Sequence, residues 1–160
     1  MSTPPPPPDA VAWTSADGQT SNHSPAGTVT KIVIGKEPRK AGAGAGSIPL
    51  SSAVRDTLPG LLASPALTHL HLWQVTGIGD LLATLPQSLQ VLDLRGCRDL
   101  TALPALPDSL ETLDLGWCGS LESLTVSRLP ALNYLHVDGC AQLDETDFNA
   151  CLKGCHALLE

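Results

Sequence analysis

Aromatic side chains are scarce in this chain. Its 160 residues include three Trp, one Tyr and one Phe, so aromatics make up 3% of a sequence that is 42% hydrophobic. A core must therefore be built from aliphatic side chains, chiefly leucine. No apolar run approaches the roughly 18 residues that a membrane-spanning helix needs. The length allows one small domain with a tail, and we expect it to be soluble.

Clusters of positive charge are also missing. The formal net charge is −7, which makes nucleic acid and anionic membranes poor partners. The opening segment, MSTPPPPPD, has neither the positive region nor the apolar core of a secretory signal. Five cysteines are an odd number, which favours reduced thiols over disulfides. We therefore expect a cytoplasmic protein, or a secreted effector without a conventional signal peptide.

Motifs for catalysis and cofactor binding are absent from the sequence. There is no Gly-x-Ser-x-Gly elbow, no His-Glu-x-x-His and no phosphate-binding loop. Two sets of residues offer metal-ligand chemistry without the spacing of a structural zinc site: His69, His71, Asp93 and Asp114, and Cys140, Cys151, Cys155 and His156. Asp93 and Asp114 could share a proton, although a solvated acidic stripe is the commoner arrangement. We expect no enzyme activity, no cofactor and no metal.

One pattern in four copies dominates the second half of the chain. Leu-x-x-Leu-x-Leu-x-x-Cys-x-x-Leu begins at Leu89, Leu110 and Leu132, and a looser copy with Val75 in place of Cys begins at Leu67. The starts lie 22, 21 and 22 residues apart. A fixed period of this size is typical of stacked structural units. Alternation within Leu-x-Leu predicts a strand whose leucines face inward and stack on those of the next copy.

The pattern resembles that of leucine-rich repeat proteins. The connector at 103–110, Leu-Pro-Ala-Leu-Pro-Asp-Ser-Leu, is similar to the connector of bacterial repeats of this family. The resemblance implies an α/β solenoid, a right-handed superhelix of about four or five rungs with a parallel concave sheet. Its convex side would be irregular and extended, with short helices. The resemblance also implies that Cys97, Cys118 and Cys140 form an interior ladder that bonds to backbone groups.

The rest of the chain is expected to cap this array. Residues 1–28 form a Pro-rich tail and N-terminal cap, with disorder over at least residues 1–10. Residues 29–66 supply a capping strand, a Gly/Ala loop and a short helix that begins at Ser51 or Ser52 and ends at Pro59-Gly60.

The repeats are expected to occupy residues 67–160. A helix capped by Asp144 or Thr146 follows the last complete copy. Because Leu158 matches the first Leu of another copy, the last repeat looks incomplete, and the chain could be a fragment of a longer protein. The alternative is a helical cap over residues 144–160.

Side chains that alternate with the inward leucines are the candidates for binding a partner. They are His69, His71, Trp73, Asp93, Arg95, Asp114, Trp117, Tyr134, His136 and Asp138. Aromatic residues and Arg are enriched in interface hot spots. We expect a non-catalytic protein-interaction module or scaffold, and an unpaired end of the array could favour end-to-end self-association.

Two other functions stay open from the sequence. The resemblance also implies the recognition part of an effector ubiquitin ligase, or of a nucleotide-switch immune-type receptor, with its catalytic domain elsewhere. A decayed or purely structural repeat remnant is the third interpretation, and it predicts no partner.

Overall fold

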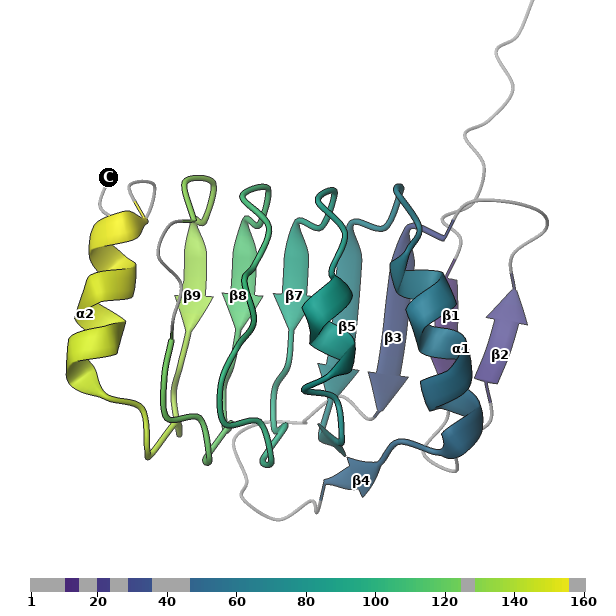
Figure 1. Ribbon diagram of the computed structural model, residues 1–160, viewed down its shortest axis with the longest axis horizontal. Helices are drawn as coiled ribbons and strands as arrows, with labels where there is room; N and C mark the ends of the chain where they lie inside the picture. The colour runs from purple at the N-terminus through teal and green to yellow at the C-terminus, as the bar shows by residue number, and fades with distance from the viewer. Residues whose placement is uncertain (1–10, 15–19, 24–28, 36–46, 125–128, 156–160) are drawn as a thin grey trace, which may run out of the picture.

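A seven-stranded sheet forms one layer of the protein, and helices form the other (Figure 1). The computed structural model describes residues 11–14, 20–23, 29–35, 47–124 and 129–155. The strands follow the order β2-β1-β3-β5-β7-β8-β9 across the sheet. Their bounds are Val11–Thr14 (β1), Thr20–His23 (β2), Lys31–Gly35 (β3), His69–Trp73 (β5), Val91–Asp93 (β7), Thr112–Asp114 (β8) and Tyr134–His136 (β9).

Parallel pairing runs through most of this sheet. Only the β1–β2 pair is antiparallel, and the other five neighbouring pairs are parallel. The register aligns equivalent positions of the sequence copies, so that Leu70, Leu92, Leu113 and Leu135 stand side by side. Each copy adds one strand next to the previous one because its connection returns the chain to the same end of the sheet.

The N-terminal end of the sheet extends beyond the expected capping strand. β3 covers most of the predicted strand, but β1 pairs with it in parallel and β2 pairs with β1. The sequence analysis did not predict these two strands because the segment from 11 to 23 has no periodic apolar pattern. The predicted disorder at 1–10 and the Gly/Ala run at 41–46 lie outside the described residues.

Helix α1, Ser52–Leu62, begins where the sequence predicts but ends later. The Ser51 hydroxyl accepts the N–H of Val54 at 3.4 Å, which caps the helix. The helix then continues through Pro59, so the predicted stop at Pro59-Gly60 is wrong. A proline removes one backbone donor. Burial of Leu58 and Leu62, at 1% and 0% exposed, offsets that loss because both side chains enter the core.

The remaining connections are short or irregular. A 3-10 helix, η1, spans Leu81–Thr84, which the sequence analysis did not predict. β4, Ile48–Pro49, and β6, Val75–Thr76, form a separate two-stranded parallel sheet. Helix α2, Glu145–Gly154, begins after Asp144, whose carboxylate accepts the Thr146 N–H at 2.7 Å. Of the two predicted caps, Asp144 and Thr146, it is therefore Asp144 that caps the helix.

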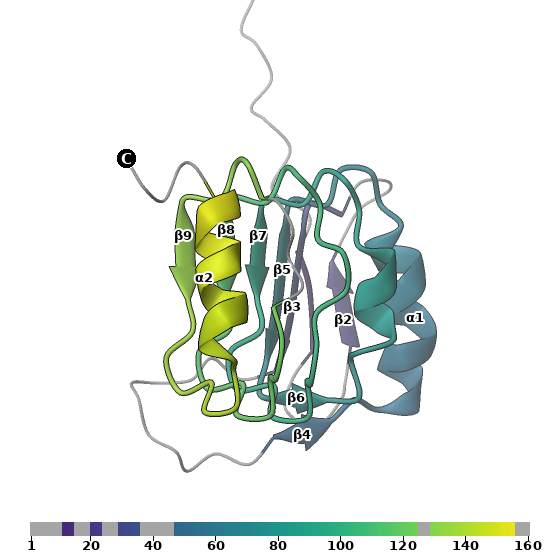
Figure 2. The same cartoon turned by 60° about the vertical axis from the view of Figure 1, so that its left-hand side comes forward.

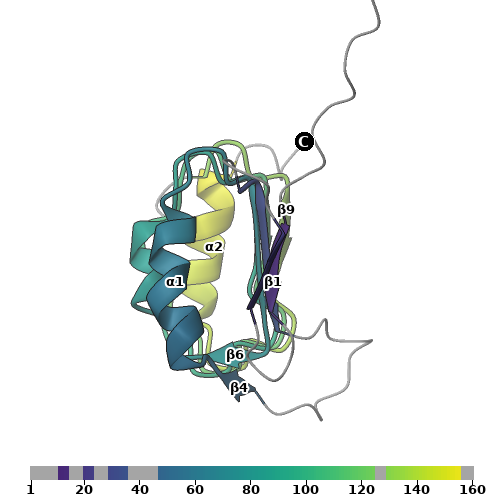
Figure 3. The same cartoon turned by 90° about the vertical axis from the view of Figure 1, so that its right-hand side faces the viewer.

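The core lies between the two layers. Leucines of the repeated pattern fill it, and the two leucines of Leu-x-Leu are 0% exposed in each of the first three copies: Leu70, Leu72, Leu92, Leu94, Leu113 and Leu115. Turning the molecule shows α1 and α2 on the same face of the sheet (Figures 2 and 3). The fold is thus a mixed α/β arrangement of two layers. No helix among the described residues is both long enough and apolar enough to cross a membrane.

Candidate functional site: the outer face of the sheet

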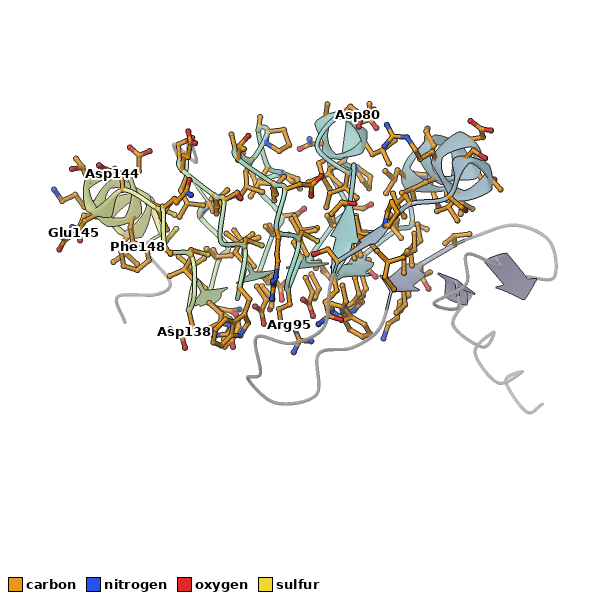
Figure 4. The ribbon with its side chains drawn as sticks, turned by 90° about the horizontal axis from the view of Figure 1, so that it is seen from below. Asp80, Arg95, Asp138, Asp144, Glu145 and Phe148 are labelled. Carbon is orange, nitrogen blue, oxygen red and sulfur yellow. The ribbon has the colours of Figure 1, made fainter. Side chains whose placement is uncertain are left out.

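The sheet has one face that no described helix covers. Because successive side chains of a strand point to opposite faces, the residues between the buried leucines line it. Figure 4 shows Arg95 and Asp138 projecting on this side, away from Asp144 and Phe148 on α2. We call this surface the outer face. Its candidate residues are His69, His71, Trp73, Asp93, Arg95, Asp114, Tyr134, His136 and Asp138.

Carboxylates that alternate with histidine and arginine side chains form a continuous row across four strands of the outer face. We call this row the charge ladder; it consists of His71, Asp93, Arg95, Asp114, His136 and Asp138. In that order, the closest nitrogen–oxygen distances between neighbours are 3.4, 2.7, 3.5, 2.9 and 3.2 Å. The sequence analysis selected all six residues individually, but not their connection into one network.

The two aspartates at the centre of the ladder are buried. Asp93 and Asp114 are 6% and 9% exposed, so they do not form the solvated stripe that the sequence suggested. They are directly paired across β7 and β8, where two like charges repel each other. The Arg95 guanidinium lies between them, with a two-point contact to Asp93 and a longer approach to Asp114. This cation makes the close pair of carboxylates tolerable.

Asp93 is held in its ionised form. Burial alone would raise the pKa of its carboxyl group, but hydrogen bonds from His71 and Arg95 outweigh that effect. The pKa of Asp93 consequently lies well below its usual value of 3.8. A proton shared between the two aspartates is therefore disfavoured, and the pair does not have the electrostatics of a carboxylate dyad.

His136 lies between two carboxylates. Its Nδ1 is 2.9 Å from Asp114 Oδ1 and its Nε2 is 3.2 Å from Asp138 Oδ2. Both ring nitrogens can donate only in the imidazolium form. Burial lowers the pKa of His136, but the two aspartates raise it by more, so the net shift is upward from 6.5.

Gly116 makes room for this arrangement. A methyl group at Gly116 would lie 2.8 Å from Cε1 of His136 and 3.2 Å from Asp114 Oδ1. The histidine ring thus occupies the volume that any larger residue at Gly116 would need. Sequence reasoning missed this contact, because the register pairs His136 with Asp114 and Gly116 lies two residues further along the chain.

The raised pKa of His136 predicts how stability changes with pH. The imidazolium stabilises the folded state fully below pH 6.5, and this contribution is lost as pH rises through the raised folded pKa. Urea unfolding between pH 5.5 and 8.5 should therefore show a fall in the free energy of unfolding that His136→Gln lacks. If the free energy of unfolding depended on pH equally in the wild type and the variant, an imidazolium held between Asp114 and Asp138 would be contradicted.

Trp73 lies at the other end of the charge ladder and is half-buried. The Arg95 guanidinium carbon lies 5.5 Å from the centre of its ring, a cation–π distance, and the His71 ring meets its edge at 5.3 Å. Nε2 of His71 is buried and has no hydrogen-bond partner among the described residues, whereas the buried indole N–H of Trp73 is one of the groups that lower the pKa of Asp93. Trp73 therefore supports the ladder rather than standing free on the surface.

Two aromatic side chains remain exposed at the C-terminal end of the outer face. Tyr134 on β9 is 49% exposed, and Trp117, in the turn after β8, is 37% exposed. The Trp117 ring packs on Gly139, where a methyl group would lie 2.7 Å from Cε3. Trp117 has a positive φ of 66°, and the same place in two other copies is held by Gly96 and Gly139. The ring is thus fixed in position despite its exposure.

The three cysteines of the repeated pattern point into the core instead. Their thiols donate to the carbonyls of Leu72, Leu94 and Leu115 in the preceding copies, with Sγ–O distances of 3.1, 3.2 and 3.1 Å for Cys97, Cys118 and Cys140. Burial raises the pKa of Cys97 to about 12 and that of the other two as well. These thiols are protonated, so they are poor nucleophiles and poor metal ligands.

Neither metal-ligand geometry among the described residues nor comparison with known proteins identifies a function. Among the described residues, no group of three or more His, Cys, Asp or Glu is arranged to hold a metal ion. Cys151 and Cys155 form a thiol–thiol contact at 3.9 Å, and His156 lies outside the described part of the chain. Comparison of the chain with protein-family models, curated proteins and solved structures found no match.

Proposed function

We propose that this chain is a leucine-rich repeat solenoid that binds a protein partner on the outer face of its sheet and catalyses no reaction itself. The observation that carries the proposal is the pair of exposed aromatics on a face without a described helix. Trp117 and Tyr134 are the large hydrophobic side chains exposed among the described residues. In a chain with so few aromatics, their exposure favours an interface.

The solenoid interpretation is supported by the strand order and by the cysteine contacts. Five consecutive strands carry aligned apolar residues, and each cysteine of the pattern bonds to the backbone of the copy before it. An array of this kind presents neighbouring positions of each copy as one surface. Side chains held by the charge ladder would enter a complex with little loss of conformational entropy.

The absence of catalysis is supported by the state of the polar residues. Asp93 is locked in an ion pair, and the thiols of the cysteine ladder are buried and protonated. Five thiols without a disulfide also favour a reducing compartment, and we propose the cytoplasm.

A pull-down from the native cytosol tests the proposal. Trp117→Gly removes the indole while keeping a residue that tolerates positive φ, and Tyr134→Thr keeps a good strand former. The double variant should lose a partner that the wild type retains, by at least about tenfold, because hot-spot aromatics typically contribute more than 1 kcal/mol.

A variant of the opposite face provides the matched control. Arg55→Ala/Gln87→Ala removes two side chains from α1 and from a connector, and it should retain the partner. Thermal unfolding must show that all proteins are folded. Equal recovery of the same proteins by the wild type, the control and the aromatic double variant would contradict binding on the outer face.

A further inference from the structure

We infer that the partner docks a basic, extended segment on the C-terminal end of the outer face, formed by Trp117, Tyr134, His136 and Asp138. We call these four residues the docking end. The inference rests on the proposed function, because it names the chemistry of the partner that the outer face accepts. Three independent features carry it: the distribution of charge along the chain, the spacing of side chains on β9, and the conformation of Trp117.

Charge is distributed very unevenly between the two parts of the chain. Residues 99–160 contain ten acidic and two basic side chains, whereas residues 1–98 contain six acidic and seven basic ones. The part that builds β8, β9 and α2 therefore carries a formal charge of −8, against +1 for residues 1–98. The resulting negative potential attracts a basic partner to this end and repels an acidic one or a nucleic acid.

The side chains along β9 alternate in a way that suits cationic groups. Tyr134 and His136 share one face of β9 and are about 6.7 Å apart. Asp138 follows in the turn after the strand, with its Oδ2 3.2 Å from Nε2 of His136. Asp138 is in contact with His136 through one oxygen, yet its side chain remains 83% exposed. A guanidinium can stack on the Tyr134 ring while a second one pairs with Asp138. An extended segment with a basic residue at every second position matches this spacing.

Acidic groups also flank the start of the strand. The Tyr134 N–H donates to the carbonyl of Glu111 at 3.1 Å, which brings this exposed glutamate next to the tyrosine in the neighbouring copy. The inner part of the charge ladder is different, because Asp93 and Asp114 are buried there, whereas the side chain of Asp138 stays exposed although His136 contacts it.

The conformation of Trp117 is the third feature. A left-handed backbone costs a non-glycine residue about 1–2 kcal/mol; the same place is held by Gly96 and Gly139 in two copies and by Gln74, with a φ of 54°, in the first. An indole fixed there in a strained backbone and left 37% exposed has no role in the core. The backbone N–H of Trp117 donates to the carbonyl of Asp138 at 2.6 Å, so the fixed indole lies beside the turn that carries Asp138. Such an indole can hold the aliphatic part of an Arg or Lys side chain.

Binding of a defined peptide tests the inference. The probe is a fluorescent eight-residue peptide of alternating Arg and Ser, titrated with the full chain at 50 and 200 mM salt. We expect binding at low salt that weakens at high salt. Trp117→Gly and Asp138→Asn should each weaken it about five- to tenfold, since each removes one cation-binding contact. A peptide of alternating Glu and Ser should not bind.

Glu145→Gln is the matched control. It removes the same charge from α2, on the other side of the molecule (Figure 4), and should change the affinity less than about twofold. Equal losses in Asp138→Asn and Glu145→Gln would overturn the inference, because they would mean unspecific attraction to an acidic protein. Absence of binding at 50 mM salt would overturn it as well.

The peptide titration and the pull-down distinguish failure of the basic segment from failure of the proposed function. If the Arg-Ser peptide does not bind, while a captured partner still depends on Trp117 and Tyr134, the basic segment is wrong and the outer face remains the interface. If capture of the partner depends on neither Trp117 nor Tyr134, the proposed function itself is wrong. Binding of the peptide that depends on Trp117 and Asp138, but not on Glu145, supports both.

Discussion

Replacing Arg95 with Met should lower the free energy of unfolding by about 3 kcal/mol at pH 7, because it leaves uncompensated buried charges behind. Asp93 and Asp114 would then face each other across β7 and β8 without the cation that separates them. Methionine is similar in length, so the lost packing is small. The measurement is urea unfolding followed by circular dichroism, at pH 7 and again at pH 4, where protonation of the carboxylates should reduce the loss.

A triple variant separates charge from shape. Asp93→Asn/Arg95→Met/Asp114→Asn removes both carboxylates together with the cation and should recover a large part of the lost stability. A loss below about 1 kcal/mol for Arg95→Met alone, the level of an exposed ion pair, would show that Asp93 and Asp114 are not buried in solution.

Leu113→Ala should cost about 2–5 kcal/mol of unfolding free energy, the range for a leucine removed from a packed core. Leu113 is 0% exposed in β8, between Leu92 and Leu135 of the neighbouring strands. Thr112→Ala is the matched control, since this half-buried residue precedes Leu113 in the same strand and faces the other side. It should cost less than about 1 kcal/mol. A cost below about 1 kcal/mol for Leu113→Ala would mean that the register is wrong.

The strands β3, β5, β7, β8 and β9 could be predicted because their physics is local and periodic, whereas β4 and β6 were not predicted. Alternating leucines at a fixed interval specify which side of each strand is buried and which strands are neighbours. The capped starts of α1 and α2 were likewise visible in Ser51 and Asp144. For the same reason the outer-face residues could be selected from the sequence, since their place follows directly from the alternation.

Features that depend on contacts between copies could not be predicted in this way. β1 and β2 form by pairing with an existing edge, without an apolar pattern of their own. The burial of Asp93 results from its neighbours, which no periodicity reveals. The continuation of α1 through Pro59 depends on where Leu62 packs.

Side-chain packing between copies could not be predicted either, for the same reason. The fit of His136 over Gly116, and of Trp117 over Gly139, becomes apparent only when the register between copies is known. A sequence can place such residues in columns, but their contacts depend on the three-dimensional approach of neighbouring turns.

Amide hydrogen exchange of the full chain, with and without the partner recovered by the wild type, is the most direct test of the outer face as the working surface. Binding there should slow exchange in residues 134–139, at the docking end, and leave α1 and α2 unchanged. Protection confined to the helices, with exchange at β9 unaltered, would contradict the account and move the interface to the opposite side of the protein.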